Sequence, residues 1–168
     1  MHEQTKKQEL LQLVKEHERI IFKICNTYCA NRDHRPDLAQ EIVYHLLKSY
    51  PRYDNSYKFS TWMYRIALNV AISFYRKTKA SRDRILFVEN PVEIADNISE
   101  SVELEKDIRT LQQFINALKE LDKALMLLYL EEKNYKEIGE ILGITETNVA
   151  TRIGRIKEKL KQQFLKVK

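Results

Sequence analysis

Glycine is scarce in this sequence of 168 residues, and its positions are informative. The only glycines are Gly139, Gly143 and Gly154, so no glycine-rich loop that could cradle a phosphate precedes residue 139. No apolar run approaches the roughly 18 residues of a membrane span, and the N-terminus has no continuous apolar segment typical of a signal peptide. These absences predict a cytoplasmic protein with no membrane insertion.

Cysteine and histidine are also few. Cys25 and Cys29 are four residues apart, which on a helix puts both thiols on one face, where a metal could be bound together with His34. Structural zinc sites normally have four ligands, so we predict buried cysteines without a metal. The four histidines are scattered, and no residues have the spacing of a catalytic site. We therefore expect neither an enzyme nor a cofactor.

Charge divides the chain into three parts. Residues 1–87 hold 16 basic and 9 acidic side chains, residues 88–107 hold 1 and 7, and residues 108–168 hold 12 and 8. Two basic blocks thus flank an acidic segment, and the sequence pI is about 9.1. A basic balance of this kind favours a polyanionic partner such as nucleic acid.

Apolar residues recur at three and four residues almost throughout, which predicts an all-α protein. The pattern from Leu10 to Tyr28 predicts one long amphipathic helix, and Pro36 suits the first position of a second helix. Ser60 suits the N-cap of a third helix. Residues 88–107 lack the period and contain turn formers, so we predict an extended linker, either a solvated tether or a functional insert.

The C-terminal block is typical of a helix-turn-helix. After a helix that Asp122 could cap, Asn134 and Thr145 are placed to cap two further helices, and Gly143 supplies the turn between them. In such a motif the second helix enters the major groove of duplex DNA. The residues predicted to face the DNA are Thr147, Asn148, Thr151, Arg152, Arg155 and Lys157. The alternative is a pair of helices that packs within a bundle.

The segment from Lys58 to Lys77 contains no acidic residue. It is predicted to form a helix with one apolar face and one polar face. The core-facing positions of the predicted helix are Met63, Ile66, Ala67, Val70 and Phe74. A second arc forms a polar stripe that packing does not explain: Trp62, Arg65, Asn69, Ser73 and Arg76. Nine of the sixteen aromatic residues lie between Tyr44 and Tyr75. Rings beside cations suit unpaired bases, so this block is predicted to bind single-stranded or opened DNA.

Three segments together resemble a known family. They are "DLAQEIVYHLLKSYPRYD", "FSTWMYRIALNVAISFYRK" and, after the acidic segment, "YKEIGEILGITETNVATRIGRIKEKL". In this order they are similar to bacterial RNA polymerase sigma factors of the small extracytoplasmic-function (ECF) type, over roughly residues 10–165. The resemblance implies a factor that binds core RNA polymerase, directs it to promoters and helps to open the minus-ten DNA. It also implies two small helical domains, residues 1–87 and 108–168, joined by the acidic linker 88–107.

The resemblance assigns roles to particular residues. Docking on the β′ clamp of the polymerase is implied for Asp37, Leu38, Gln40 and Glu41. Capture of a flipped minus-ten base is implied for Tyr57, Lys58, Phe59, Ser60, Thr61 and Trp62, and tracking of the opened non-template strand for Arg65, Asn69 and Arg76. The C-terminal domain would read the minus-thirty-five element. Further expected partners are the polymerase β subunit and a dedicated anti-sigma factor.

The sequence departs from the family pattern at several positions. Leu68 and Ser73 stand where the family often has Arg and Asp, and Asn148, Thr151, Ile156 and Lys157 replace commoner residues. The promoter sequence is therefore not predicted. Two other classes of protein would account for part of the sequence. One is a helix-turn-helix regulator with a helical sensor domain, and the other is an enzyme that acts on nucleic acid. The first leaves the polar stripe and the Asp37 segment unexplained, and the second lacks a catalytic constellation.

Overall fold

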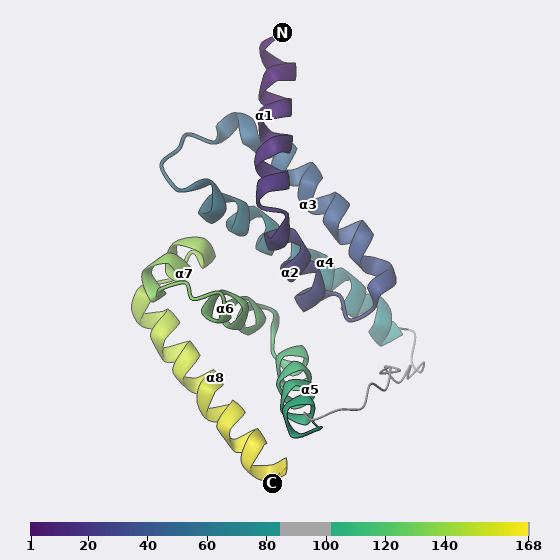
Figure 1. The fold of residues 1–168 in the computed structure, drawn as a ribbon, viewed down its shortest axis with the longest axis vertical. Helices are drawn as coiled ribbons and strands as arrows, with labels where there is room; N and C mark the ends of the chain where they lie inside the picture. Colours follow the sequence, from purple (N-terminus) through teal and green to yellow (C-terminus); the bar gives the residue numbers. More distant parts are fainter. Residues whose placement is uncertain (85–101, 168) are drawn as a thin grey trace.

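The computed structural model describes residues 1–84 and 102–167, and all regular elements in these ranges are helices (Figure 1). The N-terminal half contains α1 (His2–Glu16), α2 (Glu18–Tyr28), α3 (Arg35–Ser49) and α4 (Phe59–Arg84), with short 3-10 helices η1 (Arg32–His34) and η2 (Tyr50–Arg52). The C-terminal half contains α5 (Val102–Ala117), α6 (Glu120–Leu130), α7 (Tyr135–Leu142) and α8 (Glu146–Val167). The predicted all-α class is confirmed. No helix of the described ranges is long and apolar enough to cross a bilayer.

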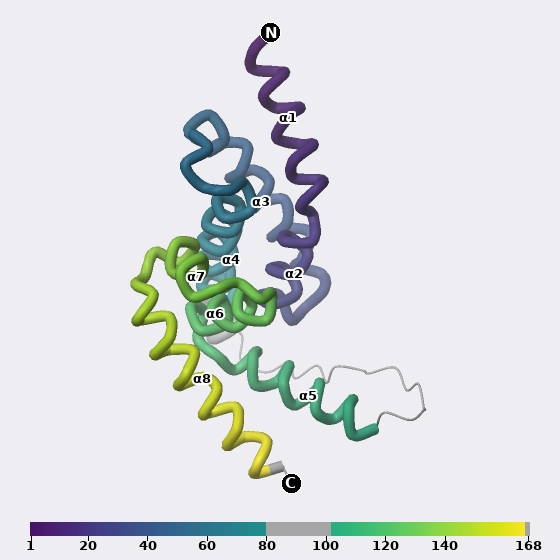
Figure 2. Tube along the Cα trace, turned by 60° about the vertical axis from the view of Figure 1, so that its left-hand side comes forward, coloured from purple at the N-terminus to yellow at the C-terminus, as the bar shows by residue number. Residues whose placement is uncertain are grey.

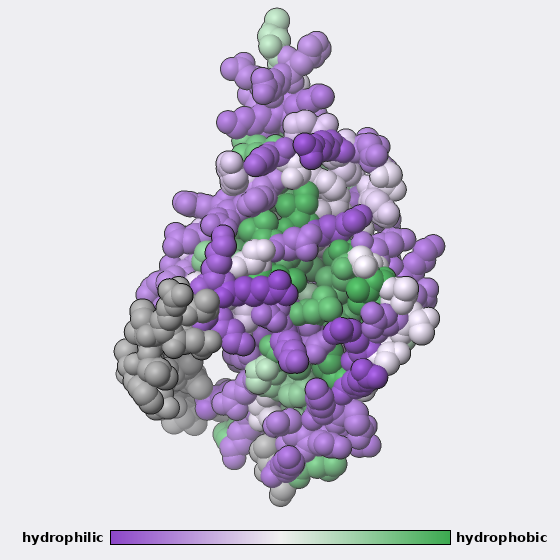
Figure 3. Space-filling view, turned by 180° about the vertical axis from the view of Figure 1, so that it is seen from behind, coloured by the Kyte–Doolittle hydropathy of each residue, from purple (hydrophilic) through white to green (hydrophobic). Residues whose placement is uncertain are grey.

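The core of the N-terminal half lies between α2, α3 and α4. Met63, Ala67, Leu68 and Ala71 of α4 are fully or almost fully buried there. Burial of a large apolar side chain contributes about 1.5–3 kcal/mol, so this side of α4 holds the bundle together. The first turns of α1 project beyond the bundle (Figure 1). Seen from behind, this projection is largely hydrophilic, whereas hydrophobic side chains are visible in the middle of the molecule (Figure 3).

The single helix predicted from Leu10 to Tyr28 is wrong, because the chain breaks at His17. This residue has φ −110° and ψ 22°, so α1 ends at Glu16 and α2 begins at Glu18. The Nδ1 atom of His17 donates to the Leu13 carbonyl at 2.9 Å, and its ring lies 5.2 Å from that of Phe59. The break leaves the spacing of apolar residues almost unchanged, and for this reason periodicity did not reveal it.

Two further helix starts differ from the prediction. The carbonyl of Lys58 accepts the first hydrogen bond of α4 from the Trp62 amide at 3.1 Å, so Ser60 lies inside the helix and is not its N-cap. The extended conformation predicted for residues 88–107 is wrong for 102–107, which belong to α5. Glu103 and Glu105 lie in the first turn of that helix, where negative charge is favourable to the helix dipole. Residues 88–101 lie outside the described residues.

The predicted helix-turn-helix is present, and local capping explains its geometry. The Asn134 carboxamide oxygen accepts from the Glu137 amide at 2.8 Å, and the Thr145 hydroxyl accepts from the Asn148 amide at 3.1 Å. Gly143 ends α7 with φ 70° and ψ 32°, a left-handed conformation in which a Cβ atom is unfavourable. All three predicted roles are confirmed. Asp122, in contrast, lies in the first turn of α6 and Lys119 occupies the N-cap position.

The two halves of the chain lie against each other. In both backbone views α6 lies beside α2 and α4, and α7 lies beside α4 (Figures 1 and 2). From this contact α5 and α8 extend in diverging directions (Figure 2). The packing of α6 is dense, since Ala124, Leu125 and Leu128 are fully buried.

The turn between α7 and α8 predicts a large effect of one methyl group. A Cβ atom at Gly139 would lie 2.7 Å from the Ile144 carbonyl oxygen, so Gly139→Ala should lower the free energy of unfolding by about 1–3 kcal/mol. A Cβ atom at Gly154 would meet nothing within 4 Å, so Gly154→Ala should raise the free energy of unfolding by up to about 1 kcal/mol. Urea unfolding of both variants measures the difference. Equal free energies of unfolding for the two variants would show that the backbone around Ile144 moves away from the added methyl group at no cost.

Candidate nucleic-acid interface

A cluster of aromatic rings surrounds the start of α4. The Trp62 ring lies 5.0 Å from that of Tyr53, 5.5 Å from Phe59 and 6.0 Å from Tyr50, measured between centroids. Tyr53 and Phe59 meet edge to face at 5.9 Å. Trp62 and Phe59 are half-buried. The cluster therefore offers partly exposed rings, held in place by other rings, at one end of the polar stripe.

The loop before α4 is held by side-chain hydrogen bonds. The Asp54 carboxylate accepts from the Ser56 amide at 3.0 Å and from the Ser56 hydroxyl, and these two bonds lower the pKa of Asp54. The Tyr53 hydroxyl donates to the Tyr57 carbonyl at 2.9 Å. Asn55 adopts φ 62°, a left-handed conformation that asparagine tolerates. This loop presents Tyr57 and Lys58 to solvent.

The predicted polar stripe of α4 lies at the surface. Asn69, Ser73 and Arg76 are exposed, and Arg65 is half-buried with its guanidinium carbon 5.3 Å from the centroid of the Tyr57 ring. This cation–π contact orients Arg65 toward the aromatic end of the stripe. The structure therefore brings together the loop, the rings and the cations that the sequence assigned to opened DNA.

Two residues near the stripe do not reach the surface. Thr61 is only 8% exposed, although the family motif includes it in the base-capturing segment. Leu68, which stands where the family often has Arg, is 1% exposed and belongs to the core. Neither side chain can contact DNA in this conformation, since the helical turn points both of them inward.

The segment predicted to dock on the polymerase forms one face of α3. Asp37, Gln40 and Glu41 are exposed, but Leu38 is fully buried and cannot be part of the docking surface. Tyr44 lies one turn beyond Gln40 and Glu41 on this face, and it is 59% exposed. Sequence reasoning missed Tyr44, although its spacing of seven residues from Asp37 could have revealed it.

The exposed face of α8 contains most of the residues predicted to read duplex DNA. Thr147, Asn148, Thr151 and Arg155 are exposed, while Val149, Ile153 and Ile156 are buried. The Thr151 hydroxyl donates to the Thr147 carbonyl at 3.0 Å. This arrangement leaves small polar groups at the N-terminal end of α8 and a cation one turn later, as the major groove requires.

The two remaining cations among the residues predicted to face DNA are engaged within the protein. A terminal nitrogen of Arg152 lies 3.3 Å from the Asp122 carboxylate of α6, and its Nε donates to the Asn148 side chain at 3.3 Å. The Lys157 ammonium lies 4.3 Å from the centroid of the Tyr129 ring, and a hydrogen bond with that side chain raises the pKa of Lys157. Arg152 is thus held in one orientation on the face predicted to read DNA, whereas Lys157 is directed toward α6.

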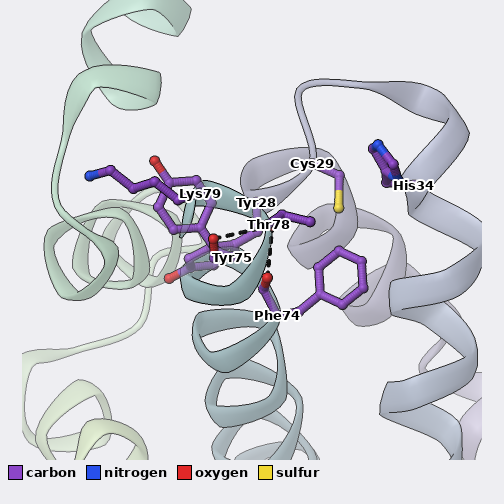
Figure 4. A pocket seen from close by; sticks show the side chains of 7 residues that line it. All are labelled: Tyr28, Cys29, His34, Phe74, Tyr75, Thr78 and Lys79. Atoms are coloured by element: carbon purple, nitrogen blue, oxygen red, sulfur yellow. Dashed lines mark hydrogen bonds between the residues drawn. The ribbon is translucent and has the colours of Figure 1, made fainter. Parts of the chain in front are cut away.

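The cysteines lie in the core beside a small pocket. Figure 4 shows Cys29 between His34 and Phe74, in a pocket of about 30 Å³ that has room for one or two water molecules. Cys25 is buried too, and burial, aided by neighbouring Cys29, raises its pKa to about 11, so its thiol is unreactive at neutral pH. Within residues 1–84 and 102–167 no group of three or more His, Cys, Asp or Glu side chains could hold a metal ion.

Comparison with known proteins identifies the family. Sigma-70 region 2 matches residues 13–81, and Sigma-70 region 4 matches residues 108–160. The ECF RNA polymerase sigma factor SigW of Bacillus subtilis is 31% identical over 154 residues, which cover 86% of this chain and 82% of SigW. RNA polymerase sigma factor SigV of the same species is 26% identical over 164 residues, which cover 97% of this chain and 95% of SigV.

A solved structure shares the fold. The sigma factor RpoE of Bartonella quintana, in complex with the anti-sigma factor NepR, matches with a TM-score of 0.65 and 18% identity, over 94% of this chain and 95% of RpoE. The chain therefore has the two conserved regions of the sigma-70 family of transcription initiation factors. Within that family it belongs to the ECF RNA polymerase sigma factors, which direct RNA polymerase to promoter DNA.

The different surroundings of two cations on α8 predict different salt dependences. Arg155 is exposed and makes no ion pair within the described residues, so Arg155→Ala should reduce the slope of log K against log salt for duplex binding by about 1. Lys157→Ala should change the slope less, because this ammonium lies on Tyr129. Fluorescence anisotropy with labelled duplex at several salt concentrations measures both. A larger change for Lys157→Ala would mean that the other side of α8 faces the DNA.

Proposed function

We propose that this ECF sigma factor acts through three surfaces: the exposed face of α3 docks on core polymerase, the start of α4 captures an unpaired minus-ten base, and α8 reads the minus-thirty-five element. The observation that supports the proposal is the presence on one chain of two distinct surfaces whose chemistry suits nucleic acid. One combines rings and cations on α4, and the other is the recognition helix of a helix-turn-helix.

Base capture follows from the chemistry of the α4 surface. Extrusion of a base from the stack costs a few kcal/mol, and stacking on an aromatic ring returns about 1–3 kcal/mol per base. The rings beside Trp62 offer such a stacking surface, and Tyr57, Lys58, Phe59 and Ser60 border it. Arg65 and Asn69 then offer donors to the phosphates of the same strand. Arg76 would join them in exchange for its ion pair with Glu120 of α6, in which the two side chains lie 3.7 Å apart. Thr61 supports the helix from within, since its side chain is buried.

Duplex reading follows from the order of residues along α8. Thr147, Asn148 and Thr151 would meet base edges, and Arg155 would meet a phosphate. Arg152 would take part from its position beside Asn148, in exchange for its contact with Asp122. Lys157 contributes to the positive field and not to a direct contact.

Polymerase docking is assigned to the exposed residues of α3. Asp37, Gln40 and Glu41 present two carboxylates and an amide on one face, with Tyr44 beside them. Such a face suits a basic, helical partner surface such as the β′ clamp. Leu38 holds α3 in the bundle and acts only from the inside.

The remaining parts of the proposal concern organisation and context. We assign residues 1–87 to the docking and minus-ten domain and residues 108–168 to the minus-thirty-five domain; the matches to regions 2 and 4 support this division. Residues 88–107 connect the domains, and 102–107 already belong to α5. The factor would act in the cytoplasm and leave all chemistry to the polymerase. The structural relative in complex with an anti-sigma factor supports such a partner for this chain.

Transcription in vitro tests the proposal as a whole. Purified protein and bacterial core polymerase would be incubated with a genomic promoter library, and transcript starts would be sequenced. We expect protein-dependent starts that share two upstream motifs. Duplex binding by the C-terminal half without any protein-dependent start would favour a helix-turn-helix regulator.

Arg65 should be needed for promoter opening more than for polymerase binding. Arg65→Ala removes the cation beside Tyr57, so we expect opening, measured by permanganate reactivity of unpaired thymines, to fall about tenfold. Binding to core polymerase should stay within about twofold. Arg19→Ala, at an exposed position of α2, is the matched control and should change neither. Equal losses of opening and binding for Arg65→Ala would contradict its assignment.

The α3 face should be sensitive to charge reversal. Glu41→Lys places a cation against a basic partner surface, and we expect affinity for core polymerase to fall about tenfold in a competition assay. Glu9→Lys makes the same change at an exposed position of α1 and should have little effect. Duplex binding by α8 should be the same in both variants. Unchanged polymerase affinity in Glu41→Lys would show that docking uses another surface.

A further inference from the structure

Helix α5 has an apolar stripe that continues beyond the core. Its members recur at three and four residues, so they lie on one side of the helix. Leu111, Ile115 and Leu118 are half-buried. Leu104 and Ile108 continue the stripe toward the start of α5, where they are 59% and 47% exposed. These two residues, the α5 strip, have the spacing of core residues but face solvent.

The last turns of α8 form a second apolar surface. Leu160 and Phe164 are half-buried, and Leu165 is 66% exposed. Together with Lys157 and Lys161 they line a surface groove of about 360 Å³, the α8 groove. Helices α5 and α8 diverge toward these ends, so the α5 strip and the α8 groove lie on the two arms of a V (Figure 2). Exposed apolar residues that gather in this way are typical of a surface that another helix covers.

Charge distinguishes the α5 strip from the α8 groove. Glu105 and Asp107 border the α5 strip on its two sides, while Lys106 points to the opposite side of the helix. In the α8 groove Lys157 and Lys161 alternate with the apolar residues. An acidic strip and a basic groove are electrostatically complementary. Each chain therefore contains both sides of one matching contact.

The occupant that satisfies both surfaces is a second copy of this chain. A purely basic partner would match α5 but repel α8, and a purely acidic partner would do the reverse. A second copy places its α5 strip in the α8 groove of the first chain and receives the α5 strip of the first chain in return. Such a reciprocal contact is closed by two-fold symmetry, which is the commonest arrangement of protein homo-oligomers.

We propose that this protein forms a homodimer in which the α5 strip of each chain occupies the α8 groove of the other. The contact covers Leu104, Ile108 and Leu165 in both copies and brings Glu105 of one chain close to Lys161 of the other. Each strip offers only about 15 Å of helix, so the interface is small and the dimer is weak. The contact is a property of the protein alone and does not depend on the function proposed above.

Sedimentation velocity of the full-length protein tests the dimer. We expect the sedimentation coefficient to rise from that of a monomer toward that of a dimer between about 1 and 200 µM. Ile108→Gln and Leu165→Gln remove apolar contacts at exposed positions, so each should weaken the dimer at least about tenfold and leave the circular dichroism unchanged. Phe22→Gln, at a position of α2 that is 67% exposed, is the matched control and should leave the dimer unchanged. A protein that is monomeric at every concentration, or a dimer that withstands both substitutions, would overturn the proposal.

Charge reversal tests whether the two surfaces meet across chains. Glu105→Lys leaves a lysine opposite Lys161, and Lys161→Glu leaves a glutamate opposite Glu105, so each variant alone should dimerise about threefold to tenfold more weakly. An equimolar mixture of the two variants has opposite charges at both contacts and should form heterodimers as readily as the unchanged protein dimerises. A mixture that associates no better than the separate variants would contradict the proposal, and so would full dimerisation of either variant alone.

Discussion

The rest of the structure depends on the burial of one side of α4 against α2 and α3. Ala67 and Ala71 are small and fully buried there, so the helices approach closely, and Met63 and Leu68 fill the space around them. Once this side is fixed, the polar stripe of the same helix must face solvent. A third side receives α6 and α7. One helix therefore positions the surface proposed to bind opened DNA and also the C-terminal half of the chain.

Most of the fold could be predicted because its signals are local. The helix caps at Asn134 and Thr145 and the left-handed turn at Gly143 each involve residues within a few positions of one another. The stripe of α4 follows from helical periodicity alone. The break at His17 was not predicted, because the chain resumes a helix at Glu18 with the spacing of apolar residues almost unchanged.

The candidate site was predicted less completely, for two physical reasons. A family motif is a continuous stretch of sequence, whereas a helix turns a residue inward at every third or fourth position, and this explains why Leu38 and Thr61 are buried. The second reason is that ion pairs such as Arg152 with Asp122 join residues from different helices. A single sequence does not indicate which of many carboxylates a given cation meets.

The aromatic cluster at the start of α4 has one more consequence. Trp62 is the only tryptophan of the chain, and its ring is half-buried among Tyr50, Tyr53 and Phe59. All indole fluorescence of the protein therefore originates at the surface where an unpaired base would stack. A base stacked there would quench this emission, so the molecule contains its own optical reporter of strand capture, visible without any attached dye.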